Sequence, residues 1–549
     1  MKITPKERSE AMHAAGLWGN ETAWQLLQRC LHDHSDRVAL IDPPNRSTLD
    51  GGSARSLGFE QVKRSAEIIA AQMTAAGVEP GAHILVQLPN ISDAVVTLLA
   101  AARLGIVVSP IPMQYAEHEI RLICRRLHPA AYVGLKTFKG EATPSEVWDE
   151  LPIGTRKLRI DPLAKEPSLK LGDYPLADDL SVLPPPPNDA DAIITVCWTA
   201  GSTGTPKGVP RSHNQWRSLS DCFSSLRPQD GDTMLCPLPM LNMFSIAGFM
   251  YPWLENGATL CLHHPMDVNV FFQQLQEHQA DWVMLPPALL NLVSLHPVML
   301  ENKVIPRPRV AFTGGGVVAP AALELIEQKL GTSISNVFGS SEGLILTATA
   351  ESVPDTAARA TCFSTITGSL QTRLYDASDN CIVTQPQTSG EIQIAGPQVI
   401  DSYLTRERDE EETVTEDGYF RCGDIFELSE DQPPLYRFMG RHKNIISRGG
   451  MQISPDEVAT LIRLHPAVRE AVIIGVTDAV IGERVCVVLE LTHGTMTLKD
   501  IHQFLDWQGL AKFKWPERLL LAKRLPRNRL GKIDIEVVRA LIDKSKPTP

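Results

Sequence analysis

Thr199-Ala200-Gly201-Ser202-Thr203-Gly204-Thr205-Pro206-Lys207-Gly208 is a stretch in which glycines alternate with hydroxyl side chains. It follows the apolar, β-rich run 192–198, so we predict a buried strand that ends in this loop. The N–H groups and hydroxyls of such a loop can close around an anion, and Lys207 adds a positive charge. The spacing matches neither G-x-x-x-x-G-K-[ST] nor G-x-G-x-x-G. Taken alone, the stretch is also compatible with a flexible surface turn.

The composition is that of a globular protein without a strong charge bias. The chain has 549 residues, enough for two or more domains, and its net charge is −12. This charge argues against bulk attraction to nucleic acid or to an anionic membrane, although a local basic groove stays an alternative. No apolar run has the length of a membrane span, and residues 1–8 lack the apolar core of a signal peptide. The ten cysteines form no C-x-x-C pair, so we expect buried thiols in a reducing cytoplasm, without disulfides or a zinc site.

Strand and helix patterns alternate on both sides of the loop. Residues 1–50 favour helices. The further predicted elements are helices at 60–76 and 94–104 and strands at 84–86, 106–108, 258–262, 282–285 and 309–312. This alternation predicts doubly wound α/β sheets, and Pro184–Pro187 predict a stiff connector before the loop.

Glycine-rich segments follow two of the later strands. Thr313–Gly316 (TGGG) and Gly339–Gly343 (GSSEG) stand where open α/β sheets bind ligands, at the carboxyl ends of strands. Gly314, Gly315 and Gly316 would let a planar ligand approach the backbone, and a tight turn is the alternative. From about residue 440 the pattern becomes compact and mixed. We therefore predict a large domain at 1–440 and a small α+β domain at 441–549.

Several further motifs, together with the loop, carry a family resemblance. They are Phe338–Gly343 (FGSSEG), Gly390–Pro397 (GEIQIAGP), Tyr419–Asp424 (YFRCGD), Gly440–Lys443 (GRHK) with Gly449, Gly450 and Ile453–Glu457 (ISPDE), and Leu525–Ile533 (LPRNRLGKI). In this order they resemble the signatures of the adenylate-forming superfamily, which contains acyl- and aryl-CoA synthetases, peptide-synthetase adenylation domains and beetle luciferases. The resemblance covers nearly the whole chain.

The resemblance implies a role for each matched residue. Activation of a carboxylate by ATP joins two anions, so positive and hydrogen-bonding groups must offset their repulsion. For the phosphates and the metal, the implied roles are phosphate binding by Thr199, Ser202, Thr203 and Lys207, Mg²⁺ binding by Glu342, a hydroxyl for the α-phosphate from Ser341, and a bridge from Lys532 between acid and phosphate. For the rest of the nucleotide, they are ribose binding by Asp424, adenine stacking by Phe338, cofactor binding at Gly339, contacts from Gly314, Gly315 and Gly316 to the adenine or the acyl group, and contacts from Arg441 to the ribose and phosphates. Taken singly, these side chains are equally compatible with surface charges or core packing.

Departures from the family pattern bear on the acid. Many relatives carry His where Asn242 stands, and siderophore aryl-acid ligases often follow it with an Asn where this chain has Met243. Ala200 and Cys422 also replace common hydroxyl residues. Yet residues 210–214 and 338–344 resemble the 2,3-dihydroxybenzoate–AMP ligase branch. With Asn242, Met243 and Phe244 lining the acyl site, we expect a hydrophobic acid, either aromatic or medium-chain aliphatic.

The resemblance also implies that the small domain moves between two half-reactions. Lys443 matches the position about which family members rotate this domain, although the local sequence alone indicates only a surface charge on a linker. Gly449 and Gly450 would leave room for a pantetheine arm.

These expectations lead to a cytoplasmic, AMP-forming acid–thiol ligase that uses ATP and Mg²⁺. The thiol acceptor is CoA, and the alternative is the pantetheine of a separate acyl carrier protein. A non-catalytic nucleotide-binding protein on this fold is a further alternative. Retention of Glu342, Asp424, Arg441 and Lys532 argues against it, since a scaffold needs none of them. The sequence identifies neither the acid nor the oligomeric state.

Overall fold

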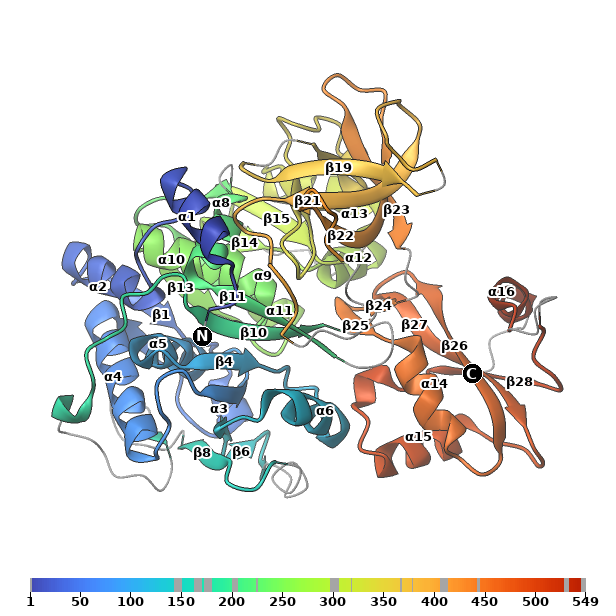
Figure 1. Ribbon diagram of the computed structural model, residues 1–549, viewed down its shortest axis with the longest axis horizontal. Helices are drawn as coiled ribbons and strands as arrows, with labels where there is room; N and C mark the ends of the chain where they lie inside the picture. Colours follow the sequence, from blue (N-terminus) through green and yellow to red (C-terminus); the bar gives the residue numbers. More distant parts are fainter. Residues whose placement is uncertain are drawn as a thin grey trace. The chain divides into compact units, whose positions relative to one another are not determined.

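The computed structural model (Figure 1) describes residues 2–142, 151–161, 170–171, 180–199, 206–223, 226–296, 306–316, 318–365, 368–377, 379–404, 413–441, 445–527 and 533–544. The chain divides into two compact units. The first comprises residues 1–113, 127–198 and 208–440, and the second comprises 114–126, 199–207 and 441–549. No described helix is both long and apolar enough to cross a bilayer.

The largest sheet of the first unit has parallel strands at its centre. Its strands, in spatial order, are β17 (Ile345–Ala348), β16 (Ile334–Gly339), β15 (Val310–Gly314), β14 (Trp282–Met284), β12 (Thr233–Cys236), β13 (Thr259–Leu262), β1 (Val38–Ile41) and β2 (Ser56–Gly58). The strands from β16 to β1 pair in parallel, and β17 and β2 are antiparallel edges. Polypeptide between successive parallel strands returns through helices, as the alternating pattern predicted.

The second sheet of the first unit contains the two strands on either side of the glycine- and hydroxyl-rich loop. Its order is β11 (Lys207–Ser212), β10 (Ile193–Thr199), β4 (Val107–Pro110), β3 (His83–Gln87), β5 (Ala131–Leu135), β8 (Arg156–Asp161) and β9 (Lys170–Leu171). β10 is the buried strand that the sequence predicted before the loop. The doubly wound α/β prediction is therefore confirmed for both sheets.

The helices of the first unit are α1 (Lys6–Ala14), α2 (Ala23–Asp33), α3 (Arg46–Asp50), α4 (Phe59–Ala75), α5 (Ser92–Leu104), α8 (His213–Asp221), α9 (Met243–Ser245), α10 (Tyr251–Asn256), α11 (Val268–Glu277), α12 (Pro287–Leu295) and α13 (Pro320–Leu330). Residues of α2, α3, α4, α5, α8 and α10 pack with both sheets in one apolar core, whereas α11, α12 and α13 contribute to a second core. Every residue of α5 is buried, and the core around it includes Val108 of one sheet and Leu260 of the other. The sequence explains this burial because α5 is apolar around most of its circumference.

The third sheet of the first unit is antiparallel and was not predicted as a separate layer. Its order is β18 (Cys362–Ser364), β23 (Leu435–Arg441), β22 (Phe420–Leu428), β21 (Ser389–Ala395), β19 (Gln371–Asp376) and β20 (Cys381–Ile382). Two of the family motifs lie on its neighbouring strands β21 and β22. Figure 1 shows this sheet in yellow and orange.

The second unit is a compact α+β assembly, in agreement with the expected class. Its strands are β24 (Ile446–Arg448), β25 (Met451–Ile453), β26 (Val468–Asp478), β27 (Gly482–Leu491) and β28 (Arg518–Ala522), and its helices are α6 (Glu117–Leu127), α14 (Pro455–Arg463), α15 (Leu498–Trp507) and α16 (Ile535–Lys544). Within it the buried Lys514 ammonium contacts Glu119 at 2.8 Å and Glu457 at 2.7 Å. These two ion pairs join α6 to the C-terminal segment.

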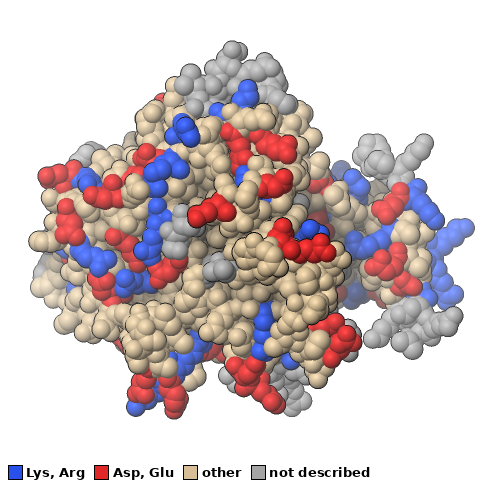
Figure 2. All heavy atoms as spheres, turned by 90° about the horizontal axis from the view of Figure 1, so that it is seen from above, with Lys and Arg blue, Asp and Glu red and all other residues tan. Residues whose placement is uncertain are grey.

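Charged side chains are interspersed by sign over the face seen in Figure 2. All ten cysteines carry free thiols, and eight of them are buried.

Candidate functional site

The first part of the site is the turn that connects β16 to β17. The Ser340 N–H donates to the Leu344 carbonyl at 2.9 Å, and the Gly343 N–H donates to the Ser340 carbonyl at 3.3 Å. Gly343 has φ +127°, and a Cβ there would lie 2.7 Å from the Gln398 carbonyl oxygen, so only glycine fits. The turn therefore presents Ser341 and Glu342 at the carboxyl end of β16, the last strand of the parallel block.

The Glu342 side chain is held by a residue that the sequence analysis did not single out. The Tyr403 hydroxyl donates to Glu342 Oε1 at 2.8 Å, and Tyr403 is 9% exposed. The Glu342 carbonyl also accepts from the Ile400 N–H at 3.0 Å. A tyrosine shortly after the Gly390–Pro397 motif was the available signal, but its partner could not be deduced without the fold.

Burial and the negative charges of Asp424 and Glu342 raise the pKa of the Cys422 thiol. Asp424 lies in β22 and is 1% exposed. Burial raises the pKa of Cys422 well above its usual value, and the negative charges of Asp424, Glu342 and Glu391 raise it further. The three carboxylates therefore lie within electrostatic range of one thiol. This places the predicted ribose-binding and metal-binding groups in one neighbourhood.

The backbone at the end of β15 requires glycine at two positions. A Cβ on Gly314 would lie 2.3 Å from the Val337 carbonyl oxygen of the paired strand. Gly315 has φ +79°, in the left-handed region. Close approach of the paired strand thus accounts for glycine at 314, and the left-handed backbone accounts for glycine at 315. Gly315 and Gly316 are exposed at the strand end.

Phe338, at the end of β16, belongs to an aromatic cluster. Its ring centroid lies 5.7 Å from Phe363, 5.1 Å from Phe426 and 4.9 Å from Phe438. The side chain is half-buried, so core packing fixes its orientation while part of the ring stays accessible. Gly339 follows it and is also half-buried.

The three predicted acyl-site residues differ in what they contact. Asn242 caps α9, because its Oδ1 accepts from the Ser245 N–H at 2.7 Å. Phe244 stacks on Phe312 with ring centroids 6.0 Å apart and an interplanar angle of 14°. Met243 packs against two of the apolar cores and stays half-buried.

The remaining predicted residues that the structure describes all belong to the second unit. Thr199 ends β10 and Lys207 begins β11, and both side chains are half-buried. Gly449 and Gly450 form the exposed β24–β25 turn with φ values of +56° and +84°. Arg441 is the last residue of β23. The other predicted positions, Ser202, Thr203, Lys443 and Lys532, lie outside the described residues.

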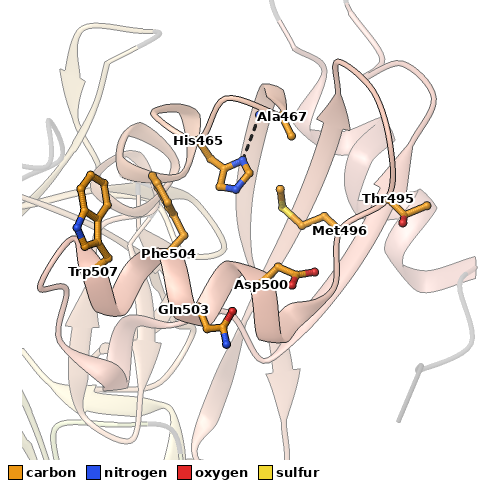
Figure 3. Close-up of a pocket in the computed structure, with 8 residues that line it drawn as sticks. All are labelled: His465, Ala467, Thr495, Met496, Asp500, Gln503, Phe504 and Trp507. Atoms are coloured by element: carbon orange, nitrogen blue, oxygen red, sulfur yellow. Dashed lines mark hydrogen bonds between the residues drawn. The ribbon is translucent and has the colours of Figure 1, made fainter.

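An open hollow of about 420 Å³ lies on the second unit and contains none of these residues. Figure 3 shows it between α15 and the α14–β26 connection. Its lining includes His465, Phe504 and Trp507, and Trp507 is 78% exposed.

A doubly wound α/β unit with Glu342 just after β16 and Asp424 within β22, together with a small α+β unit, defines the class of adenylate-forming enzymes. The comparisons with known proteins agree. The chain belongs to the AMP-binding enzyme family, whose sequence profile matches residues 27–404. The profile of the AMP-binding enzyme C-terminal domain matches residues 457–532.

Curated relatives are similar over almost their full length. Enterobactin synthase component E of Escherichia coli is 25% identical over 552 residues, which cover 97% of each chain. The 2,3-dihydroxybenzoate–AMP ligase of Bacillus subtilis is 26% identical over 98% of this chain and 97% of its own. The medium-chain fatty-acid–CoA ligase of Escherichia coli is 25% identical over 98% of this chain and 94% of its own.

A solved structure with the same fold is o-succinylbenzoate CoA synthetase from Bacillus subtilis, a double mutant bound with its product analogue. It has a TM-score of 0.78 at 22% identity and covers 96% of this chain and 99% of its own. The family resemblance and the fold class are therefore confirmed.

Proposed function

We propose that the chain activates a hydrophobic carboxylic acid with ATP to form an acyl-adenylate, and then transfers the acyl group to the thiol of CoA. The observation that carries this proposal is the fixed Ser341–Glu342 turn at the end of β16, near Asp424 on β22. Family membership supports the reaction class, because matched relatives include both AMP ligases and CoA ligases.

The residues that match the family motifs suit the charge changes of the first half-reaction. In the acid attack on the α-phosphorus, one P–O bond forms and the bond to pyrophosphate breaks, so negative charge gathers around the phosphates. Lys207 and the loop hydroxyls would bind these phosphates, and Asp424 would accept the ribose hydroxyls. A further positive charge is needed between the acid and the α-phosphate, and we assign it to Lys532.

Mg²⁺ fits the Glu342 position. Hard divalent cations prefer oxygen ligands, and Glu342 offers a half-buried carboxylate with one oxygen already oriented by Tyr403. A bound Mg²⁺ would offset phosphate charge, with Glu342 as its protein ligand.

The acid specificity follows from the apolar surroundings of Met243. Asn242 uses its side-chain oxygen as a helix cap, and Phe244 packs in an aromatic cluster with Phe312. Met243 is adaptable and lacks a strong hydrogen-bonding group for a ring hydroxyl. We therefore assign hydrophobic acids without an ortho hydroxyl as preferred substrates.

Rotation of the second unit about Lys443 would switch the enzyme from adenylation to thioester formation. Lys532 and the incoming thiol need the same reaction centre, so the second unit has to move between them. The glycine turn at Gly449 and Gly450 would then admit the pantetheine arm.

The test is a panel of acids assayed for pyrophosphate release, with and without CoA. The proposal expects release with hydrophobic acids and an acyl-CoA product when CoA is present. Acyl-adenylate that accumulates with CoA but is consumed by a pantetheinylated carrier protein would favour carrier loading, which relatives such as the salicyl-AMP ligase / salicyl-S-ArCP synthetase of Mycobacterium tuberculosis support. Nucleotide binding without turnover on any acid would favour the non-catalytic alternative.

A further inference from the structure

Arg211 is a buried arginine that joins two parts of the site. It lies in β11, directly after the glycine- and hydroxyl-rich loop, and its side chain is completely buried. One terminal nitrogen, Nη1, donates to the Gln398 carbonyl at 2.7 Å. The other, Nη2, donates to the Ser341 carbonyl, also at 2.7 Å. Arg211 therefore holds the peptide bond that precedes Glu342.

The charge of Arg211 has no carboxylate partner within ion-pair distance among the described residues. Its guanidinium lies over the Trp216 ring, 5.2 Å from the centroid. Burial lowers the pKa of Arg211 to about 10, and the nearby Cys197 and Glu342 oppose this shift. The side chain is thus still protonated near neutral pH. Burying a cation that donates only to carbonyl groups lowers the stability of the fold. The position of Arg211 therefore calls for a reason beyond packing.

Fixing the segment around Gln398 does not require Arg211. Arg8 donates to the Gly396 carbonyl at 2.9 Å and to the Val399 carbonyl at 2.8 Å, and it pairs with Asp401. The contact to Ser341 is what Arg211 adds. Arg8 is therefore a natural control, because it holds the same segment without touching the Glu342 turn.

We propose that Arg211 is a positioning residue for the carboxylate of Glu342. It fixes the main chain of the turn from the buried side through Ser341, while Tyr403 fixes the carboxylate itself. Since charge-assisted hydrogen bonds are directional and strong, the two contacts together set where the carboxylate points. Its consequence for catalysis rests on the proposed function, in which Glu342 binds Mg²⁺.

The experiment compares Arg211→Met, Arg211→Lys, Arg8→Met and Glu342→Gln with the wild type. The first readout is hydrogen exchange of the amides in residues 338–346, which needs neither nucleotide nor metal. We expect roughly tenfold faster exchange of the turn in Arg211→Met, a smaller change in Arg211→Lys, and the wild-type rate in Arg8→Met. If Arg211→Met does not fold, the exchange of the turn in Arg211→Lys is compared with that in the wild type and in Arg8→Met.

The second readout is the Mg²⁺ concentration that half-saturates acid-dependent ATP–pyrophosphate exchange. We expect about a tenfold increase in Arg211→Met, partial recovery in Arg211→Lys, and no change in Arg8→Met. Turn exchange equal in the Arg211 and Arg8 variants would overturn the positioning role. Faster turn exchange combined with an unchanged Mg²⁺ requirement in Glu342→Gln would support the positioning role but refute metal binding by Glu342.

Discussion

Arg46 and Arg211 are both completely buried in the first unit, yet their surroundings differ. Arg46 contacts Asp42 at 2.6 Å, Asp50 at 2.9 Å and Asp93 at 2.6 Å. Burial by itself would lower the pKa of Arg46, but these carboxylates outweigh it and raise the pKa. Arg211 instead donates to two carbonyl groups, and its pKa falls to about 10.

If Arg211 positions Glu342 as we propose, the difference separates a charge that serves the fold from a charge that serves the site. Three carboxylates pair with Arg46, so the cluster links α3 and α5. Among the described residues, Arg211 has no carboxylate at ion-pair distance, and it donates to the carbonyl of Ser341 in the Glu342 turn. Changes at other cations of the chain extend this comparison.

The largest expected effect is on stability at Arg46. Arg46→Met leaves three buried aspartates without their central partner, so we expect the free energy of unfolding to fall by about 3–5 kcal/mol. Urea unfolding followed by tryptophan fluorescence measures it. Arg55→Met is the matched control, because Arg55 lies 3.8 Å from Asp93 and is partly exposed. A loss below about 1 kcal/mol in Arg46→Met would show that the cluster is not structural.

Next in size is the removal of a cation that the reaction itself is expected to use. Lys532→Ala should slow adenylation about 10²–10³-fold, as loss of one charge-stabilising donor does elsewhere. Transfer from a supplied acyl-adenylate to CoA should continue, and the unfolding midpoint should not change. Adenylation at the wild-type rate would show that Lys532 is not the reactive lysine.

Changes at Lys443 test whether domain rotation depends on backbone freedom at this residue rather than on its charge. Lys443→Pro locks φ and should slow thioester formation about 10²-fold through misplacement of the reacting groups, while adenylation is spared. Lys443→Gln removes only the charge and should leave both half-reactions unchanged. Equal losses in both half-reactions for Lys443→Pro would contradict a hinge.

The smallest expected effect is at an uncharged position. Met243→Asn should shift the ratio of kcat/KM values toward 2-hydroxybenzoates, relative to unsubstituted acids, by roughly tenfold. The acid panel measures this ratio directly. If the wild type already prefers salicylate or 2,3-dihydroxybenzoate, the assignment of the acyl site to hydrophobic acids is wrong.

Periodicity and motifs were sufficient to predict the doubly wound sheets and the strand before the loop, because short apolar runs and helix caps are local signals. The apolar run 192–198 illustrates this, since it forms β10. The separate antiparallel sheet could not be predicted, because strands such as β18 and β23 pair across about seventy residues.

Sequence motifs mark only part of the candidate site. Ser341, Glu342 and Asp424 stand in motifs, whereas Arg211 and Tyr403 act through contacts that span 130 and 61 residues of sequence. Arg211 stands in the short stretch Lys207–Ser212, which mixes polar and apolar residues, so the local sequence does not indicate that its side chain is buried. Its partners became visible only in the fold.

The central claim is that the chain forms an acyl-adenylate, and the nucleotide products test it most directly. The purified protein is incubated with ATP, Mg²⁺ and the best acid of the panel, and the products are separated by ion-exchange chromatography. Our account predicts AMP and pyrophosphate in equal amounts when CoA is present. ADP and inorganic phosphate would contradict it.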